Sequence, residues 1–355
     1  ITSGTYKIET KEDLIKLSKI ASKEGNIMGG EFVLAGNIDM SGVDFEGIQF
    51  IGKQNDNNTY TTANFDGNGY KISNLNNMLF GQQSYVDVEN LGIVNSHIIN
   101  NNPDEYSVYG IIGSVVNSAT NCYAKGCKIF LGGQSDALVA DIVGGLVGCP
   151  YSDIDSSWCD TNITGSATTV GGLVGCTVSS VLNSFSTGNC DVSACILGGL
   201  VGLYGAKSIE NSYSTGKLYN HNIKTRDDDT LFTLGLGVAS TIINSYSTSQ
   251  IEVAGKDESA LSIGIADNLI NVGYDSSINP KIAGSMSNTG NLTDSSSLLT
   301  DFSSANLELA KKKAGFISDI SKFSTAGAIS FSSVDSSKKL TNGTYTISSA
   351  SELAK

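Results

Sequence analysis

The sequence predicts an all-β protein, a right-handed parallel β-helix (β-solenoid) with an N-terminal α-helical cap. Two short motifs that recur in step along the chain are the basis of this prediction. In the clearest copy they are residues 198–202 (GGLVG) and 211–216 (NSYSTG), and the copy before it has residues 171–175 (GGLVG) and 183–188 (NSFSTG). Repeats of roughly 20–50 residues are typical of solenoids, in which each copy packs only on its neighbours.

Both motifs form columns over seven copies, with spacings of 27 to 35 residues in the first motif. The last glycines of the first motif are Gly81, Gly113, Gly148, Gly175, Gly202, Gly237 and Gly264. The second motif begins at Asn90, Asn121, Ser156, Asn183, Asn211, Asn244 and Asn271. We expect the stacked asparagine amides to form hydrogen bonds from rung to rung.

Within a copy, residues 209–215 alternate as a strand does, which places Ile209 and Tyr213 on one face and Ser212 and Ser214 on the other. We therefore expect an outer face of small polar residues and an inner ladder of aromatic rings. The rings of that ladder are Tyr123, Trp158, Phe185, Tyr213 and Tyr246. The alternative for this pattern is a sandwich of ordinary hairpins.

The chain divides into four segments. They are the N-terminal cap and leading strands (1–75), the solenoid (76–284), a C-terminal segment and linker (285–339), and the start of a further tandem unit (340–355). Residues 10–24 have the pattern of an amphipathic helix with Thr10 as its N-cap. Such a helix would cover the open strand edge of the first rung.

Two features of the chain indicate how the units are arranged. Residues 340–347 (LTNGTYTI) echo residues 1–8 (ITSGTYKI), so we expect one unit of a tandem array. The longer copies insert loops at 100–106, 132–140 and 221–230, and insertions into a solenoid usually emerge on one face.

Composition and charge exclude several classes of partner. The 355 residues carry a net charge of −13, with a pI near 4.5 and no basic stripe. This balance argues against nucleic acid or an anionic membrane as a partner. No apolar run reaches transmembrane length, so we expect no membrane insertion of this fragment. No motif in the sequence indicates a cofactor.

The pairing of residues 198–202 with 211–216 resembles the GLUG-motif repeats of bacterial cell-surface proteins, both adhesins and the repeat region of immunoglobulin-A zinc peptidases. Residues 38–41 (IDMS), 65–75 (FDGNGYKISNL) and 79–81 (LFG) are similar to the leader that precedes such repeats. The resemblance implies an extracellular β-helical stalk or adhesive module, secreted or anchored at the cell surface. It does not imply catalysis, because the repeats of the peptidases lie outside the protease domain.

The residues themselves argue against an enzyme. A zinc protease of that type needs two histidines four residues apart with a glutamate beside the first. The chain has only His97 and His221. A polysaccharide-degrading β-helix enzyme would use clustered carboxylates. The candidates Asp153, Asp155 and Asp160 do not recur as a column in the next copy. We therefore expect no catalytic residues.

The last inserted loop carries the run Arg226, Asp227, Asp228 and Asp229. Carboxylates of this kind bind hard cations, but a solvated loop explains the run more simply, and we expect no metal site. The same four residues are the first candidates for ligand contact if the chain is adhesive.

The seven cysteines contain no Cys-x-x-Cys pair, which argues against structural zinc. We expect them to serve mainly as small apolar residues in the stack. Cys149 and Cys176 directly follow the repeat glycine in adjacent copies, and stacking would place them about 4.8 Å apart. If a disulfide forms, this is the pair that we expect.

These observations predict a non-enzymatic structural stalk or filament-forming module of a large extracellular repeat protein. Its partners would be copies of itself or adjacent tandem units, joined end to end. The alternative is an adhesin module that binds host glycan or protein through the inserted loops.

Overall fold

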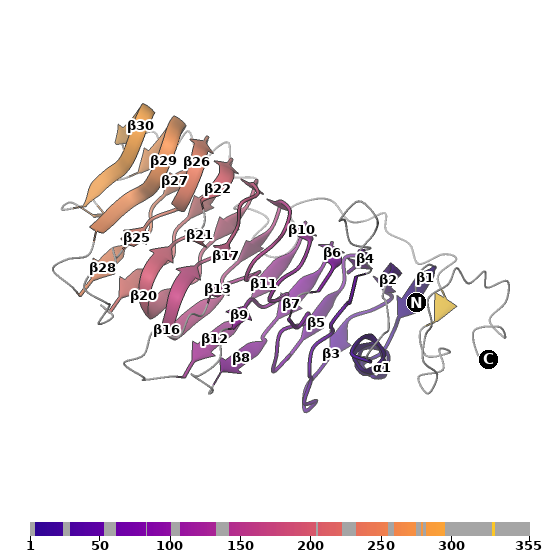
Figure 1. The fold of residues 1–355 in the computed structure, drawn as a ribbon. Helices are drawn as coiled ribbons and strands as arrows, with labels where there is room; N and C mark the ends of the chain where they lie inside the picture. The colour runs from indigo at the N-terminus through magenta and orange to yellow at the C-terminus, as the bar shows by residue number, and fades with distance from the viewer. Residues whose placement is uncertain are drawn as a thin grey trace.

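The chain folds into a parallel β-helix in which each strand pairs with the equivalent strand of the next rung (Figure 1). A computed structural model describes residues 4–23, 29–52, 62–82, 84–100, 107–132, 142–203, 205–221, 232–254, 259–274, 278–279, 282–294 and 329–330. Within this part of the chain, 29 strands form one continuous sheet and two more form a second sheet. The prediction of a β-solenoid is confirmed.

Four ladders of strands make up the walls, and we number them in the order in which the chain passes through a rung. Ladder one extends along the whole helix with an unbroken series of pairings. Its strands are β1 (Thr5–Ile8), β2 (Gly30–Leu34), β4 (Ala63–Asp66), β6 (Val86–Glu89), β10 (Ser118–Thr120), β14 (Ile154–Asp155), β18 (Val181–Leu182), β22 (Ala206–Glu210), β26 (Gly237–Ile243) and β29 (Ser259–Tyr274).

Ladder two follows ladder one after a sharp corner and holds the aromatic residues of the repeat. Its strands are β3 (Ile38–Asp39), β5 (Lys71–Ser73), β7 (Gly92–Val94), β11 (Tyr123–Lys125), β15 (Trp158–Cys159), β19 (Phe185–Ser186), β23 (Tyr213–Ser214) and β27 (Tyr246–Ser247). The long strand β29 also continues this ladder beyond β27.

Ladder three consists of β8 (His97–Asn100), β12 (Lys128–Leu131), β16 (Asn162–Gly171), β20 (Cys190–Gly198), β24 (Leu218–Asn220) and β28 (Ile251–Val253). Ladder four consists of β9 (Val108–Tyr109), β13 (Ile142–Gly144), the second halves of β16 and β20, β25 (Phe232–Leu234) and the start of β29. The glycine motif then turns the chain back to ladder one and includes the small sheet of β17 (Val174–Cys176) and β21 (Val201–Leu203).

Two further strands lie at the ends of the helix. Strand β30 (Ala283–Asp294) pairs with β29, so the ladder extends beyond residue 284, where the sequence predicted the solenoid to end. Strand β31 (Ile329–Ser330) pairs with β1 at the opposite end.

The main apolar core extends along the helix through the described part of the chain. One buried position of ladder one recurs from rung to rung in strict register, because parallel strands stack equivalent residues. This row is Phe65, Val88, Ala119, Ile154, Val181, Ile209, Ile242 and Leu269. Each rung therefore depends on both neighbours to remove its apolar surface from water.

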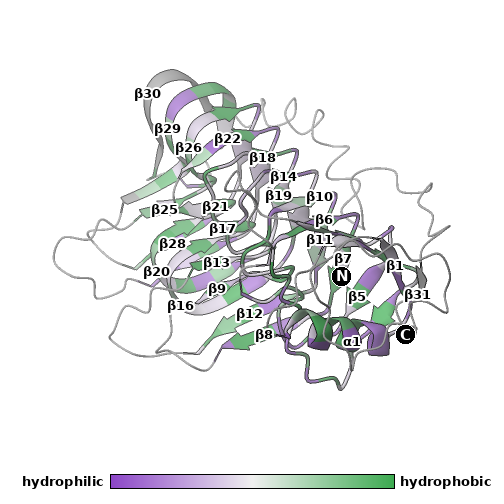
Figure 2. Cartoon of the chain, turned by 45° about the vertical axis from the view of Figure 1, so that its right-hand side comes forward, coloured by the Kyte–Doolittle hydropathy of each residue, from purple (hydrophilic) through white to green (hydrophobic). Residues whose placement is uncertain are grey.

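Helix α1 (Lys11–Ala21) lies at the N-terminal end of the core, as predicted (Figure 1). Thr10 is its N-cap and forms a capping box with Asp13. The buried face holds Leu14, Leu17, Ile20 and Ala21, and the helix shows both hydrophobic and hydrophilic stretches in Figure 2. The helix ends at Ala21, three residues before the predicted end, where Ser22 donates a hydrogen bond from its amide to the carbonyl of Ser18.

The predicted inward and outward faces of residues 209–215 are wrong beyond Asn211. This asparagine has a φ of 49°, so the chain turns a corner and the alternation of a single strand stops there. Ser212 and Ser214 are fully buried instead of lying on an outer polar face. Since Tyr213 lies between two inward residues, its ring points to the opposite side of the strand.

Gly113 is one residue out of its predicted column. It pairs with Phe80 on one side and with Val147 on the other, where the prediction placed it beside Gly148. The cause lies one strand earlier, where β9 pairs Tyr109 with Val143 and thereby fixes the register of the following turn.

Candidate functional site

The two repeat motifs meet inside the rung, where a glycine of the first motif packs against a serine of the second. Ser214 is buried and donates a hydrogen bond from its hydroxyl to the carbonyl of Gly235 in the next rung. A Cβ on Gly199 would lie 2.6 Å from Oγ of Ser214, and a Cβ on Gly172 would lie 2.8 Å from Oγ of Ser186. The middle glycine of GGLVG therefore makes room for the serine that follows the aromatic residue.

The corner between ladders one and two is built from an asparagine column. Asn90, Asn121, Asn183, Asn211 and Asn244 all have φ near 50°, a region that asparagine adopts more easily than most residues. The amide of Asn121 donates to Asn90 at 2.9 Å, and the amide of Asn211 donates to Asn183 at 3.1 Å. The predicted hydrogen bonding between rungs is confirmed.

A serine column lies directly inside this corner. The backbone amides of Ser157, Ser184 and Ser212 each donate to the hydroxyl of the serine one rung further, at 3.1 Å. The hydroxyl of Ser212 in turn donates to the carbonyl of Glu210 at 2.7 Å. These bonds satisfy polar groups that the corner buries, which explains why serine tolerates full burial here.

The five predicted aromatic residues form a continuous stack. Ring centroids of successive residues lie 4.7 to 5.4 Å apart with interplanar angles of 4° to 9°. The stack is an apolar cluster of its own, separate from the main core. Burial raises the pKa of the Tyr246 hydroxyl to about 12, and it also raises the pKa of Tyr213. The stack is therefore a structural spine along the helix.

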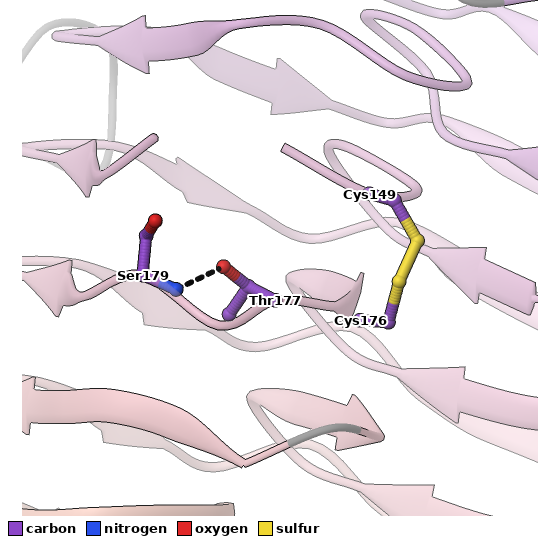
Figure 3. The surroundings of a disulfide bond; sticks show 4 residues. All are labelled: Cys149, Cys176, Thr177 and Ser179. Carbon is purple, nitrogen blue, oxygen red and sulfur yellow. Dashed lines mark hydrogen bonds between the residues drawn. A yellow bond between two sulfur atoms is a disulfide. The ribbon is translucent and has the colours of Figure 1, made fainter. Parts of the chain in front are cut away.

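Cys149 and Cys176, the pair that the sequence singled out, form a disulfide between adjacent rungs, with Cα atoms 4.9 Å apart (Figure 3). The amide of Cys176 donates to the carbonyl of Gly148 at 2.9 Å, so the bridge joins rungs that the backbone already aligns. Beside it, the hydroxyl oxygen of Thr177 accepts a hydrogen bond from the amide of Ser179 at 3.0 Å.

The free thiols are unsuited to nucleophilic chemistry. Cys122, Cys127, Cys159, Cys190 and Cys195 are all buried. Burial raises the pKa of the first four thiols to about 12, so they remain protonated at neutral pH. These four cysteines act as small apolar residues of the core.

The three acidic residues considered for catalysis each support a turn or a corner. Asp153 accepts a hydrogen bond from the amide of Ser180 at 2.7 Å. Asp155 accepts from the side chain of Asn183 at 2.8 Å, and Asp160 accepts from the amide of Gly126 at 2.6 Å. The three carboxylates therefore stabilise turns and corners of the repeat.

The two histidines lie far apart. His97 begins β8, whereas His221 follows β24 four strands along ladder three. In the described part of the chain, no group of three or more His, Cys, Asp and Glu residues is placed to hold a metal ion. Among the same residues, no helix is long and apolar enough to cross a membrane. Arg226, Asp227, Asp228 and Asp229 lie outside the described residues.

The insertions of the three longer copies all interrupt the chain at the same corner of the helix. Strands β8, β12 and β24 of ladder three precede the insertions, and β9, β13 and β25 of ladder four follow them. In the shorter copies β16 and β20 pass the same corner as single unbroken strands. We name this edge, between ladders three and four, the insertion corner.

A row of outward side chains on ladder three leads to the insertion corner, and the sequence motifs did not reveal it. The row, which we name the outer strip, contains Ile99, Phe130, Thr164, Asp191, Tyr219 and Glu252 in register. Phe130 is 47% exposed and Ile99 is 61% exposed. The neighbouring residues in the chain, Ile98 and Ile129, are buried. Side chains of a strand point alternately inward and outward, and this alternation is the signal from which the strip could have been predicted.

Comparisons with known proteins agree with this architecture. Residues 193–219 match the family model described as the GLUG motif. A crystal structure at 1.30 Å resolution of a proposed immunoglobulin A1 protease from Bacteroides ovatus is similar over 86% of this chain and 88% of that chain, with a TM-score of 0.51 and 17% identity. No curated protein matches the chain significantly.

A second solved structure, described as IgA1 Protease, is similar over 87% of this chain with a TM-score of 0.46 and 20% identity. The alignment spans only 24% of that longer chain. The matched residues 193–219 include the glycine turn, the asparagine corner and the aromatic strand of one rung. Residues 193–219 thus match the GLUG motif, and the repeats of which they are one copy stack as a parallel β-helix.

Proposed function

We propose that this chain is a non-enzymatic structural module, a stiff rod within a larger secreted or surface-anchored protein. The observation that carries the proposal is the unbroken pairing of ladder one from β1 to β29. Its ten strands are separated by nine steps, so the ladder spans roughly 43 Å at about 4.8 Å per step. The asparagine column and the aromatic stack stiffen the same axis.

The disulfide between Cys149 and Cys176 supports an extracellular location, because disulfides persist mainly in oxidising compartments. The carboxylates and thiols described above supply structure to the repeat, which favours a module without catalytic activity. In this proposal the chain's partners are adjacent units or further copies of itself, arranged end to end.

Small-angle X-ray scattering tests the rod. We expect an elongated particle for this chain, and a straight particle of about twice the length for a fusion of two copies. Negative-stain images of the fusion should show the same straight shape. A compact particle, or two rods joined by a mobile hinge, would contradict a rigid stalk. Incubation with immunoglobulin A1 should leave that substrate intact, and cleavage would refute the non-enzymatic assignment.

Adhesion is the second candidate, and one observation favours it. The strands on either side of all three insertions end at the insertion corner, which is one edge of the rod. Binding sites are often built on loops that a rigid scaffold positions. Shortening the three loops should then abolish binding to host glycans or proteins on an array while the elongated shape remains. Binding that survives loop shortening would contradict adhesion through the loops.

A further inference from the structure

The outer strip is a second surface feature, distinct from the insertions, and it has an unusual composition for this chain. Two of the five exposed large hydrophobic residues of the described chain, Ile99 and Phe130, lie side by side on it. Three rungs beyond Phe130 lies Tyr219, and Thr164 and Asp191 occupy the rungs between them. Two apolar side chains thus begin the strip, and hydrogen-bonding groups follow them along the helix axis.

The charged groups at the far end of the strip are paired with one another. Lys217 forms an ion pair with Glu252 at 3.0 Å, and the imidazole of His221 contacts the carboxylate of Asp191. Tyr219 lies between these pairs, with its ring centroid 4.0 Å from that of His221 and 5.9 Å from Nζ of Lys217. His221 and Lys217 thus flank the phenol, and the charge of Lys217 offsets that of Glu252.

From these observations we propose that the outer strip binds an uncharged glycan that lies along the helix axis. The C–H face of a sugar ring packs on an exposed aromatic ring such as Phe130, and aromatic residues provide a large apolar contact of fixed shape. Sugar hydroxyls donate to carboxylates, and such charge-assisted hydrogen bonds are stronger than neutral ones. Asp191 and Glu252 supply the carboxylates, and the Tyr219 phenol supplies a further polar group.

Charge and backbone pairing both favour this partner. The chain carries a net charge of −13, which repels sulfated or sialylated glycans. A peptide cannot be added as a further strand over β12, β16, β20 or β24, because the backbone of each pairs with the rungs on both sides. Along these four strands, recognition depends on the outward side chains. They repeat once per rung, about every 4.8 Å, which is close to the length of one sugar unit.

Affinity electrophoresis of the full chain tests the proposal. The gels contain one uncharged polysaccharide each, namely hydroxyethyl cellulose, xyloglucan, mixed-linkage β-glucan, galactomannan or dextran. We expect at least one of them to retard the protein. The variants Phe130→Ala and Tyr219→Ala should each weaken binding at least tenfold, and Asp191→Asn should weaken it at least threefold.

Tyr151→Ala is the matched control, because Tyr151 is 46% exposed and lies outside the outer strip. It should bind as tightly as the unaltered chain, and all variants should keep a cooperative thermal transition. Further gels contain the anionic polysaccharides alginate or heparin. The proposal is overturned if no uncharged polysaccharide retards the chain, if only these anionic gels retard it, or if Phe130→Ala and Tyr219→Ala bind normally. Scattering tests the rod separately, so a failure here leaves the structural proposal standing.

Discussion

At the scale of single residues, the repeat motif is explained by what each position does at one corner of the helix. The asparagine adopts a positive φ, the next serine bonds inward, the aromatic ring stacks on its neighbours and the second serine meets a glycine. Because each role is steric or involves a hydrogen bond, individual substitutions can test them.

Gly199→Ala should destabilise the helix by about 1–3 kcal/mol, the usual cost of overpacking a close-packed interior. The added Cβ would meet Oγ of Ser214 at 2.6 Å and would also collide with the carbonyl of Gly235. Urea unfolding followed by circular dichroism measures the loss.

The matched control for this substitution is Gly36→Ala, because a Cβ on Gly36 meets no atom within 4 Å. That variant should be neutral, or slightly more stable through the reduced entropy of its unfolded chain. Equal midpoints for the two alanine variants would show that the glycine–serine contact does not limit packing.

Substitutions of Asn211 separate its backbone role from its amide role. Alanine loses the bond to Asn183 and must adopt a φ of 49°, which costs roughly 1–2 kcal/mol beyond the lost hydrogen bond. Glycine adopts that φ without a steric penalty and loses the amide bond. The thermal midpoint of Asn211→Ala should therefore lie below that of Asn211→Gly. The reverse order would mean that the positive φ is not what selects asparagine.

The sequence predicted the asparagine column and the aromatic stack, because both consist of identical or similar residues at a regular spacing. It did not predict that Ser212 and Ser214 are buried. The prediction extended the alternation of a single strand through Asn211, but the positive φ of this residue turns the chain and reverses which side chains point inward. The signal for such a corner is an asparagine that recurs at a fixed place within an otherwise strand-like segment.

At the scale of elements, the disulfide between Cys149 and Cys176 connects two rungs 27 residues apart. Replacing both cysteines by serine should lower the free energy of unfolding by about 2–4 kcal/mol, mainly because the unfolded chain gains freedom. The midpoints of thermal unfolding, measured without reductant, compare the unaltered chain with the double serine variant.

Dithiothreitol provides the control for the disulfide. It should lower the midpoint of the unaltered chain towards that of the double serine variant, and it should leave the variant unchanged. If the unaltered chain and the variant unfold together without reductant, the bridge contributes nothing to stability.

Helix α1 and the ladders were predictable to different degrees. The helix followed from its cap and its apolar spacing, and the structure changes only its end. The outer strip escaped the sequence analysis because ladder three contains no recurring motif, and its outward residues differ from rung to rung. Its members become neighbours only after the register of each rung has been set elsewhere, by the asparagine corner and the glycine turn.

At the scale of the whole molecule, the buried thiols make stability depend on alkaline pH. The thiols of Cys122, Cys127, Cys159 and Cys190 have pKa values raised to about 12 by burial, against an ordinary value of 9.0. Below pH 9 they are protonated in both states, and their contribution to stability is complete. As the pH rises from 9 towards 12, the unfolded thiols lose protons first, so the free energy of unfolding falls.

Urea midpoints at pH 8, 9 and 10.5 measure this dependence, with the largest fall expected above pH 9. As an independent check, iodoacetamide at pH 8 should label none of the five free cysteines in the folded chain and all five in urea. A constant midpoint across this range, or labelling of the folded protein, would contradict the burial of these thiols.

The insertion corner also has a practical consequence for protein engineering. Asn220 ends β24 and Phe232 begins β25, yet both strands keep register with β20, which passes the corner without interruption. The length of chain at this edge is therefore independent of the pairing on either side. Foreign peptides grafted between these strands would be displayed at a defined height on a rigid support, and grafts after β8 and β12 would add further epitopes along the same edge.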